Sequence, residues 1–323
     1  MPHFARPRVL VSRCLGFAAC RYNGAMLHEP VIERLKAFAD LVDVCPEVEI
    51  GLGVPRAPIR LVSSLDGARL VQPETGRDVT DEMDEFARGF LDGLGPCDGA
   101  VLKAGSPSCG LRDVRLYASA ERGSAHTRTM GVFGGRISET LPSWAIEDEG
   151  RLHSFDLRQH FLTRLFANAR LRAVAVSGRM SELVAFQAHH KLLLMTYHQT
   201  EMRALGRLVA NEGHRPFADV AADYVLRFSH ALSRPPRRTS AINVLEHAFG
   251  YVSDHLTARE KAFFLETLAD YRAERLPLAA PLRLMQSLTV RFDVSYLADQ
   301  VLFEPFPETL VEVLDSGKGR AVR

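Results

Sequence analysis

The chain has 323 residues, 46% of them hydrophobic and 24% charged, with a formal net charge of +1. This length exceeds that of a typical domain, so we expect two domains, and the small net charge excludes a uniformly basic surface. No apolar run is long enough to cross a membrane and no signal-peptide pattern opens the sequence. We therefore expect a cytoplasmic protein with no membrane partner.

The first half alternates short apolar runs with helical periodicity, which favours a mainly parallel β-sheet in an α/β domain. Strands are predicted at residues 8–12, 41–45 and 99–103, a hairpin at 59–71 turned at Asp66-Gly67, and helices at 30–38 and 78–94. Residues 131–136 are predicted as a loop, and residues 141–152 as an exposed connector.

The second half shows helical spacing only, which predicts an all-α domain. Its helices are predicted at residues 156–173, 181–211, 217–229, 240–256, 257–272 and 281–292. Thr257 followed by Glu260 is a capping-box pattern at the start of one of them. We place the α/β domain with its connector at residues 1–175 and the helical domain at residues 176–323.

Three cysteines carry the functional signal. Cys14, Cys45 and Cys109 each follow a predicted buried strand and lie beside glycine or proline, whereas Cys20 and Cys97 have no such place in the pattern. Residues just past the carboxyl ends of parallel strands converge in space. A single buried cysteine often fills the core, but three at equivalent junctions predict a metal centre with one coordination position left for a substrate.

Three motifs make the first half resemble the thiouracil desulfurase family over residues 7–140: SRCLGFAACRYNG, CPEVEIGLGVPR and KAGSPSCG. One departure is Cys14-Leu15-Gly16-Phe17, where short members tend to have C-L-L-G; the thiol stays in place. The second half, through FQAHHKLLLMTYHQTEMRALGRLVA and later segments, is similar to a helical domain of unknown function often fused behind such desulfurases. Gln187 stands there in place of an expected histidine.

The resemblance implies a 4Fe-4S cluster held by Cys14, Cys45 and Cys109, with one iron open for the substrate sulfur. Spacing alone would equally permit zinc. The fused arrangement resembles enzymes that remove sulfur from thiolated nucleosides in RNA, notably 4-thiouridine in transfer RNA. We therefore expect a desulfidase that converts thiouridine to uridine with release of sulfide, and thiolated tRNA as its partner.

Two residues near the cysteines are expected to be catalytic. Glu47 is placed to act as a general base on water or as a proton shuttle, and its alternative role is a salt bridge with Arg56 or Arg60. Ser106 is expected to orient the ring or the attacking water, and its alternative is a turn residue that bonds its own backbone. Ser108 and Lys103 are expected beside the substrate, Lys103 to offset negative charge.

Other polar residues are candidates for substrate contact. Arg21, Tyr22 and Asn23 offer a ring face and polar handles to a flat base, although Tyr22 has an alternative role as a core aromatic. In the helical half, Lys191 with its neighbouring histidines, and Arg237 and Arg238, are expected to contact RNA phosphates. His190 and His198 lie too far apart on a helix to share one metal ion.

Two other functions stay open from the sequence. One keeps the chemistry but takes free 2-thiouracil as the substrate. The other is a non-catalytic, zinc-stabilised RNA-binding protein in which the three thiolates and a fourth ligand close the site.

Overall fold

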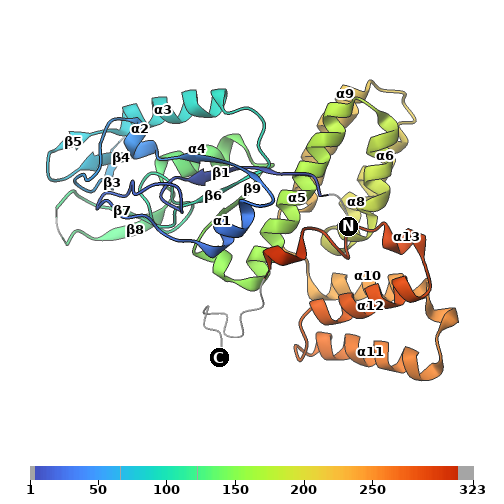
Figure 1. Cartoon of the computed structure of the whole chain (residues 1–323). Coiled ribbons are helices and arrows are strands. Elements are labelled where there is room, and N and C mark those ends of the chain that lie inside the picture. Colours follow the sequence, from blue (N-terminus) through green and yellow to red (C-terminus); the bar gives the residue numbers. More distant parts are fainter. Residues whose placement is uncertain (1–3, 66, 122, 312–323) are drawn as a thin grey trace. The chain divides into compact units, whose positions relative to one another are not determined.

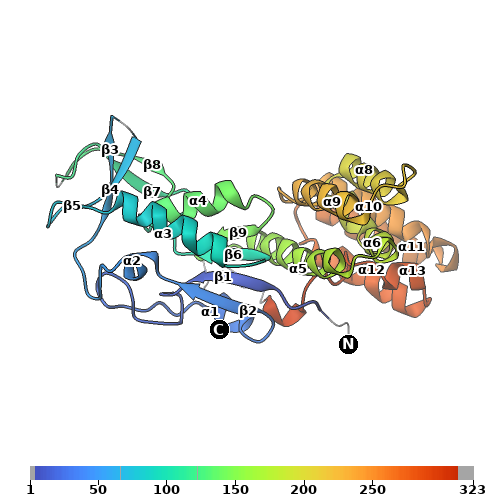
Figure 2. The same cartoon turned by 90° about the horizontal axis from the view of Figure 1, so that it is seen from above.

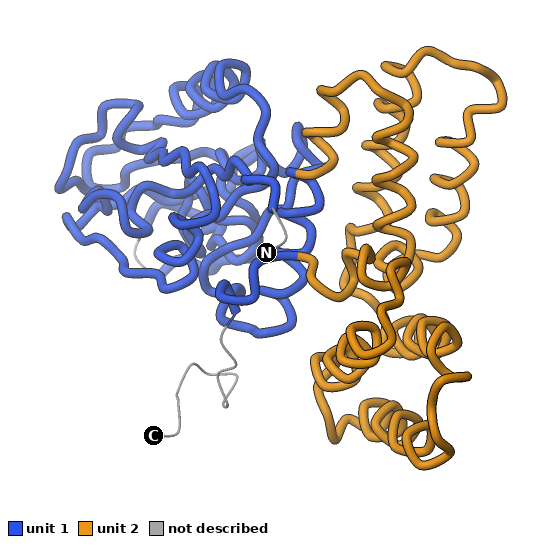
Figure 3. Tube along the Cα trace, turned by 45° about the vertical axis from the view of Figure 1, so that its right-hand side comes forward, with its two compact units in different colours: residues 1–169, 306–323 blue, residues 170–305 orange. Residues whose placement is uncertain are grey.

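The computed structural model describes residues 4–65, 67–121 and 123–311, which form two compact units (Figure 3). Described residues up to Ala169 and from Phe306 onward belong to the first unit, and Arg170–Pro305 form the second. The division falls between Ala169 and Arg170, inside helix α5 (Phe155–Ser177), which also contains the boundary placed after residue 175. Residues from Phe306 return to the first unit because Phe306 and Leu310 are buried in its core.

The first unit is built on a four-stranded parallel sheet, as the α/β prediction requires. Its strands are β1 (Arg8–Ser12), β2 (Asp40–Val44), β6 (Gly99–Leu102) and β9 (Ala145–Asp148), in the order β2-β1-β6-β9. All three pairings are parallel. The carboxyl ends of β1, β2 and β6 therefore meet at one edge of the sheet.

Both faces of this sheet are covered, because alternate residues of a strand point to opposite sides. Val9 and Val11 pack in one core with α1 (Pro30–Leu35) and α5, whereas Leu10 packs in the other with α3 (Thr80–Gly93) and α4 (Val132–Thr140). Figure 1 shows α3 and α1 on opposite sides of β1. Burial on both faces explains why β1 reads as a continuous apolar run.

A second sheet of five strands lies at one end of this unit (Figure 2). Its strands, in the order β5-β4-β3-β7-β8, are β3 (Arg60–Ser64), β4 (Gly67–Gln72), β5 (Arg77–Asp78), β7 (Val114–Tyr117) and β8 (His126–Thr129). The predicted hairpin is β3 and β4, which pair antiparallel. Its turn residue Asp66 lies outside the described residues.

Two predictions in the first unit are wrong. Residues 131–136 were expected to be a loop but begin α4, where Gly134 and Gly135 are buried in close packing. Residues 141–152 were expected to be an exposed connector but contain β9, whose Ala145, Glu147 and Asp148 are buried. The acidic residues at the end of β9 hide its strand character, because buried strands of a parallel sheet are usually apolar.

The second unit is helical, as predicted. After α5 it contains α6 (Met180–His189), α7 (Lys191–Tyr197), α8 (Gln199–Ala210), α9 (Phe217–Ala231), α10 (Arg238–Gly250), α11 (Ala258–Arg272), α12 (Ala279–Arg291) and α13 (Ser295–Ala298). Thr257 and Glu260 form the expected capping box. Within the described residues, no helix combines the length and apolar character that a membrane crossing requires.

The single long helix expected at residues 181–211 is instead three helices. The chain breaks at His190 and at His198, which adopts an extended backbone with φ −155° and ψ 90°. The ring of His198 accepts a hydrogen bond from the Glu201 amide and so caps α8. A side chain that satisfies an amide at a helix start stabilises that break.

Candidate metal centre

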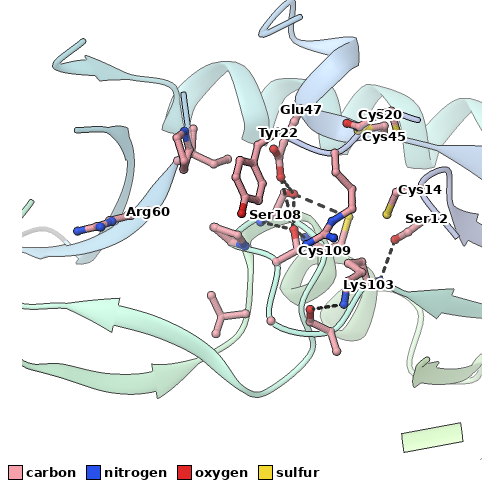
Figure 4. Close-up of a pocket in the computed structure, with 18 of the residues that line it drawn as sticks. Ser12, Cys14, Cys20, Tyr22, Cys45, Glu47, Arg60, Lys103, Ser108 and Cys109 are labelled. Carbon is pink, nitrogen blue, oxygen red and sulfur yellow. Dashed lines mark hydrogen bonds between the residues drawn. The ribbon is translucent and has the colours of Figure 1, made fainter. Parts of the chain in front are cut away.

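The three cysteines singled out from the sequence line one cavity of about 500 Å³. Cys14 lies two residues after β1, Cys45 directly follows β2, and Cys109 lies in the loop after β6. Figure 4 shows Cys14, Cys45 and Cys109 around the same space, together with Ser12 and Lys103. Neighbouring parallel strands deliver these thiols to one edge of the sheet.

A fourth thiol, that of Cys20, lines the same cavity. Cys20 is buried, and its carbonyl oxygen accepts a weak hydrogen bond from Sγ of Cys45, at 3.8 Å. Sequence reasoning set Cys20 aside because it follows no strand. The feature that could have indicated its place in the cavity is its position in the same short loop as Cys14, directly before Arg21. Cys97, the other cysteine set aside, is buried in the core with Leu94.

Burial raises the pKa of the Cys14, Cys20 and Cys109 thiols. The pKa of Cys14 rises to about 11 and that of Cys20 to about 12, mainly through burial and then through the nearby thiol of Cys45. The pKa of Cys109 is also raised by burial, and a hydrogen bond with Ser12 opposes the rise. Without a cation the thiols of Cys14, Cys20 and Cys109 are therefore protonated at neutral pH, and binding a metal group to them would release protons.

The donor set is chemically suited to a soft metal group. Thiolates are the preferred ligands of iron–sulfur clusters and of zinc. In residues 4–311 as described, no three Cys, His, Asp or Glu side chains are grouped so that they would hold a single metal ion. The four thiols instead share the wall of a cavity, where they could ligate a group that contains several metal ions.

The loop that carries Cys109 is held against the start of α4. The amides of Val132 and Gly134 donate to the carbonyl oxygens of Pro107 and Ser108, at 3.2 and 3.0 Å. A Cβ on Gly134 would lie 2.5 Å from the carbonyl oxygen of Cys109, so only glycine permits this approach. The glycine-rich sequence at residues 131–135 therefore serves to place Cys109.

Glu47 is buried beside the cysteines and is held on both carboxylate oxygens. Its Oε2 pairs with Arg56, at 2.6 Å from Nη2 and 2.9 Å from Nε, and its Oε1 accepts from the Ser108 hydroxyl at 2.7 Å. The alternative salt bridge with Arg56 is thus present, whereas Arg60 is not its partner. An ion pair on one oxygen leaves the other directed toward Ser108 and the cavity (Figure 4).

Ser106 and Ser108 both line the cavity, with different contacts. The Ser106 hydroxyl accepts from the amides of Ser108 and Cys109, at 3.3 and 3.2 Å, and lies 3.5 Å from Glu47. Ser106 therefore acts as a turn residue as well as a cavity residue. Ser108 is the closer hydroxyl partner of Glu47.

Lys103 lines the cavity but its ammonium is already paired. It forms an ion pair with the buried carboxylate of Glu149 and donates to the carbonyl oxygen of Ala104 at 2.9 Å. Its amide donates to the Ser12 hydroxyl at 2.9 Å. These contacts tie the loop after β6 to the ends of β1 and β9.

The expected base-binding segment is only partly in the cavity. Arg21 and Tyr22 line it, and the Tyr22 ring is 43% exposed, so it is not a core aromatic. Asn23 does not line the cavity, because its Oδ1 accepts from the Ala25 amide at 3.2 Å in a local turn. The Oδ1 of Asn23 is therefore already used by its own turn.

The expected RNA contacts in the second unit differ in availability. Lys191 and Arg237 are exposed. Arg238 forms an ion pair with Glu274 and lies over the Tyr271 ring. His190 is buried against Phe186 with ring centroids 3.8 Å apart, so the expectation that it contacts phosphate is wrong.

Comparison with known proteins matches each half to a family. The 2-thiouracil desulfurase family model matches residues 9–149, and the model of a family of unknown function, DUF1722, matches residues 191–307. The uncharacterized protein YbbK of Bacillus subtilis (strain 168) is 34% identical over 109 residues, which are 32% of this chain and 72% of that protein.

Two further similarities cover nearly half of this chain. The uncharacterized protein YbgA of Escherichia coli (strain K12) is 28% identical over 151 residues, 46% of this chain and 89% of that protein. The solved structure of the [4Fe-4S]-dependent thiouracil desulfidase TudS is 28% identical and covers 46% of this chain and 93% of that chain, with a TM-score of 0.36. Through residues 9–149 the chain belongs to the 2-thiouracil desulfurase family.

Proposed function

We propose that the protein removes sulfur from thiouridine, most specifically 4-thiouridine in tRNA, with the help of an iron–sulfur cluster. In this reaction water supplies the oxygen of the new C=O bond, the C=S bond breaks, and sulfur leaves as sulfide with the two protons of water. The observation that carries the proposal is one cavity, in a chain of this family, that combines Cys14, Cys45 and Cys109 with the Glu47–Ser108 pair.

The thiolates of Cys14, Cys45 and Cys109 are the proposed cluster ligands, which leaves one iron without a protein ligand. A bound cluster supplies a Lewis acid for the thiocarbonyl sulfur and so makes the attached ring carbon more electrophilic. The ligands come from loops after three neighbouring strands, and the contacts of Ser106, Ser108 and Gly134 fix the loop of Cys109. Such a supported loop presents its thiol with little reorganisation.

Glu47 is the proposed general base. Its ion pair with Arg56 holds Oε2, and Oε1 is the oxygen on the side of Ser108. There Glu47 would accept a proton from the attacking water and return it to the departing sulfur. The Ser106 and Ser108 hydroxyls lie 2.9 Å apart and would orient that water or the pyrimidine ring.

Tyr22 is the proposed stacking surface for the base. Its ring lines the cavity and is partly exposed, as a surface that receives a flat ligand must be. Stacking of a base on an aromatic side chain contributes about 1 to 3 kcal/mol. Arg21 lies beside it, with its guanidinium carbon 5.8 Å from the ring centroid.

The second unit is the proposed docking surface for RNA, with Lys191 and Arg237 as the exposed phosphate contacts. The proposed location is the cytoplasm, because Cys14, Cys20, Cys45, Cys97 and Cys109 are all free thiols and a reducing compartment maintains that state.

The test of the function is sulfide release after anaerobic reconstitution with iron and sulfide. Thiolated tRNA should release sulfide faster than free 2-thiouracil, and the reverse order would identify the free base as the substrate. Cys14→Ser, Cys45→Ser and Cys109→Ser should each lower the iron content and abolish release. Cys20→Ser is the matched control, a buried thiol of the same cavity, and should retain iron. Full activity in any of the first three variants would contradict the proposal.

One observation favours a second function. Cys20 gives the cavity a fourth thiol, and four thiolates drawn together by zinc would close a structural site. In that case the protein would be a zinc-stabilised RNA-binding protein without turnover. Metal analysis separates the two functions, because stoichiometric zinc with no sulfide release, and loss of zinc in Cys20→Ser, would support the second.

A further inference from the structure

Ser12 is a buried polar residue at the end of an apolar strand. It is the last residue of β1, is only 2% exposed, and lines the cavity beside the cysteines. Because alternate residues of a strand point to opposite faces, its side chain lies on the same face as that of Leu10. Leu10 packs in the core that also contains Cys109. The strand therefore directs the Ser12 hydroxyl toward the side of Cys109.

Ser12 joins the ends of two neighbouring strands where the thiols lie. Its hydroxyl oxygen accepts a hydrogen bond from the amide of Lys103, the residue after β6, at 2.9 Å (Figure 4). Its carbonyl oxygen accepts from the Leu15 amide at 2.8 Å and so closes the turn that contains Cys14. Ser12 therefore contacts the segments that lead to two of the proposed ligands, Cys14 and Cys109.

The single hydroxyl proton of Ser12 is directed to sulfur. A serine hydroxyl has one proton to donate and two lone pairs that accept. The Lys103 amide occupies an accepting position, and the Cys109 side chain is a further hydrogen-bond partner. This bond lowers the pKa of the Cys109 thiol against the effect of burial, as a donor to the thiolate does. Ser12 is therefore the donor and Cys109 the acceptor.

A second hydroxyl near the same sulfur has its proton engaged elsewhere. The Ser108 hydroxyl lies 3.8 Å from Sγ of Cys109 but only 2.7 Å from Oε1 of Glu47. A hydroxyl has one proton, and the shorter contact, with the carboxylate, is the stronger hydrogen bond. Ser12 therefore donates to the proposed ligand, whereas Ser108 donates to the proposed base.

Cys109 is the proposed ligand that most requires such a donor. It is 5% exposed, whereas Cys14 is 9% exposed and Cys45 is half-buried. A buried thiolate loses the hydrogen bonds that water would donate, and burying a charge without them costs free energy. The hydroxyl of Ser12 replaces part of this lost solvation.

We propose that Ser12 is a positioning residue of the metal centre, which donates a hydrogen bond to the Cys109 thiolate when that thiolate ligates the cluster. The proposal rests on the proposed function and adds a residue to its site. A donor to a ligand fixes the orientation of that ligand. Because the positive end of the donor faces sulfur, it also stabilises an added electron and raises the reduction potential of a bound cluster.

The closing experiment measures the reduction potential of the full-length protein after anaerobic reconstitution with iron and sulfide. Ser12→Ala should shift the equilibrium between oxidised and reduced cluster about tenfold toward the oxidised form, a potential about 59 mV more negative for one electron. It should also lose iron to a chelator faster. Ser12→Thr keeps the hydroxyl and should keep both values close to those of the unchanged protein. An unchanged potential in Ser12→Ala would overturn the proposal.

Ser108→Ala is the matched control, because it removes a hydroxyl near the same sulfur whose proton goes to Glu47. It should leave the potential unchanged, although sulfide release should fall. An equal shift of the potential in Ser108→Ala, or a potential in Ser12→Thr as low as in Ser12→Ala, would also overturn the proposal. Ser12 would then act only in the fold, as the acceptor for the Lys103 amide.

Metal loss separates this result from failure of the proposed function. The full-length protein is also loaded with zinc alone, and transfer of the zinc to a chelator is timed. Faster zinc loss in Ser12→Ala than in Ser12→Thr and Ser108→Ala, in a protein that releases no sulfide, would support the hydrogen bond to Cys109 and reject the desulfidase. Sulfide release with equal potentials and equal rates of metal loss in all variants would support the desulfidase and reject this role of Ser12.

Discussion

The hydroxyl of Ser108 donates to Oε1 of Glu47 at 2.7 Å and joins the loop after β6 to the short helix α2 (Pro46–Glu49) after β2. This contact places the proposed base between two loops that carry proposed ligands, Cys45 and Cys109. The other oxygen of Glu47 pairs with Arg56, whose side chain is only 4% exposed. Glu47 is therefore held on both carboxylate oxygens, unlike a mobile surface carboxylate.

Glu47→Gln keeps the shape of this side chain and removes its charge. Because it leaves the buried Arg56 guanidinium unpaired, we expect the free energy of unfolding to fall by about 3 kcal/mol, measured by urea unfolding. Sulfide release should also be lost. Glu49→Gln is the control on the same short helix, where the pair with Arg13 is partly exposed and a loss of at most about 1 kcal/mol is expected.

A double variant separates stability from chemistry in this pair. Glu47→Gln with Arg56→Gln should be more stable than the sum of the two single losses predicts, because no unpaired charge remains. Its sulfide release should stay as low as in Glu47→Gln. Recovery of activity together with stability would mean that Glu47 acts only in the fold.

Gly134→Ala should disturb the proposed metal centre through the backbone. The added Cβ would lie 2.5 Å from the carbonyl oxygen of Cys109 and displaces the loop that carries this thiol. We expect reduced iron retention after reconstitution and a loss of about 1 to 3 kcal/mol in unfolding free energy. Gly135→Ala is the matched control in the same helix, since its Cβ would meet only the Met130 side chain, at 3.6 Å. Equal iron retention in the two variants would argue against this role of Gly134.

The sequence predicted those parts of the fold in which local pattern and burial agree. Val9, Leu10 and Val11 form an apolar run because both faces of β1 are covered, and the strand was predicted with its observed bounds. The meeting of Cys14, Cys45 and Cys109 at one cavity followed from the rule that parallel strands present their carboxyl ends at one edge. Both inferences required only the sequence of residues within and just after each strand, without knowledge of tertiary contacts.

The missed features depend on tertiary contacts. The acids at the end of β9 look exposed in the sequence, yet Glu147 pairs with Arg151 and lies buried. In the sequence Gly134 is typical of a loop. The close approach of the Cys109 carbonyl oxygen explains why a glycine stands at this position of a helix. Cys20 follows no strand and reaches the cavity through a turn. No periodicity in the chain encodes such juxtapositions.

The proposed RNA docking can be tested with two neighbouring arginines. Arg238 is paired with Glu274, whereas Arg237 is exposed and has no carboxylate partner within the described residues. Arg237→Gln should weaken tRNA binding and reduce its salt slope by about one, as expected when one phosphate contact is lost. Arg238→Gln should have the smaller effect on filter-binding or fluorescence titrations. Equal affinities for both variants and the unchanged protein would exclude this segment from the RNA interface, and Lys191→Gln would then be the remaining test.

His190 should make the stability of the second unit depend on pH. Burial lowers its pKa from the ordinary 6.5 to about 3, and its Nε2 has no hydrogen-bond partner among the described residues. The folded state therefore holds the ring neutral, while the unfolded chain takes up a proton below pH 6.5. This contribution is fully present above pH 6.5 and is lost as the pH falls toward about 3.

From this group we expect the unfolding free energy to fall by up to about 1.4 kcal/mol for each pH unit between pH 6.5 and about 3. Urea unfolding at pH values between about 7.5 and 5 measures the slope. His190→Asn should flatten it, because the amide does not titrate, although the variant starts from lower stability. His160, whose pKa burial lowers to about 4, contributes in the same direction in the first unit and is unchanged by the substitution. His189→Asn, at the exposed neighbouring residue, should keep the original slope. The contrary outcome is an equal slope of unfolding free energy against pH in His190→Asn and in the unchanged protein. It would mean that the ring of His190 takes up its proton in the folded protein as readily as in the unfolded chain.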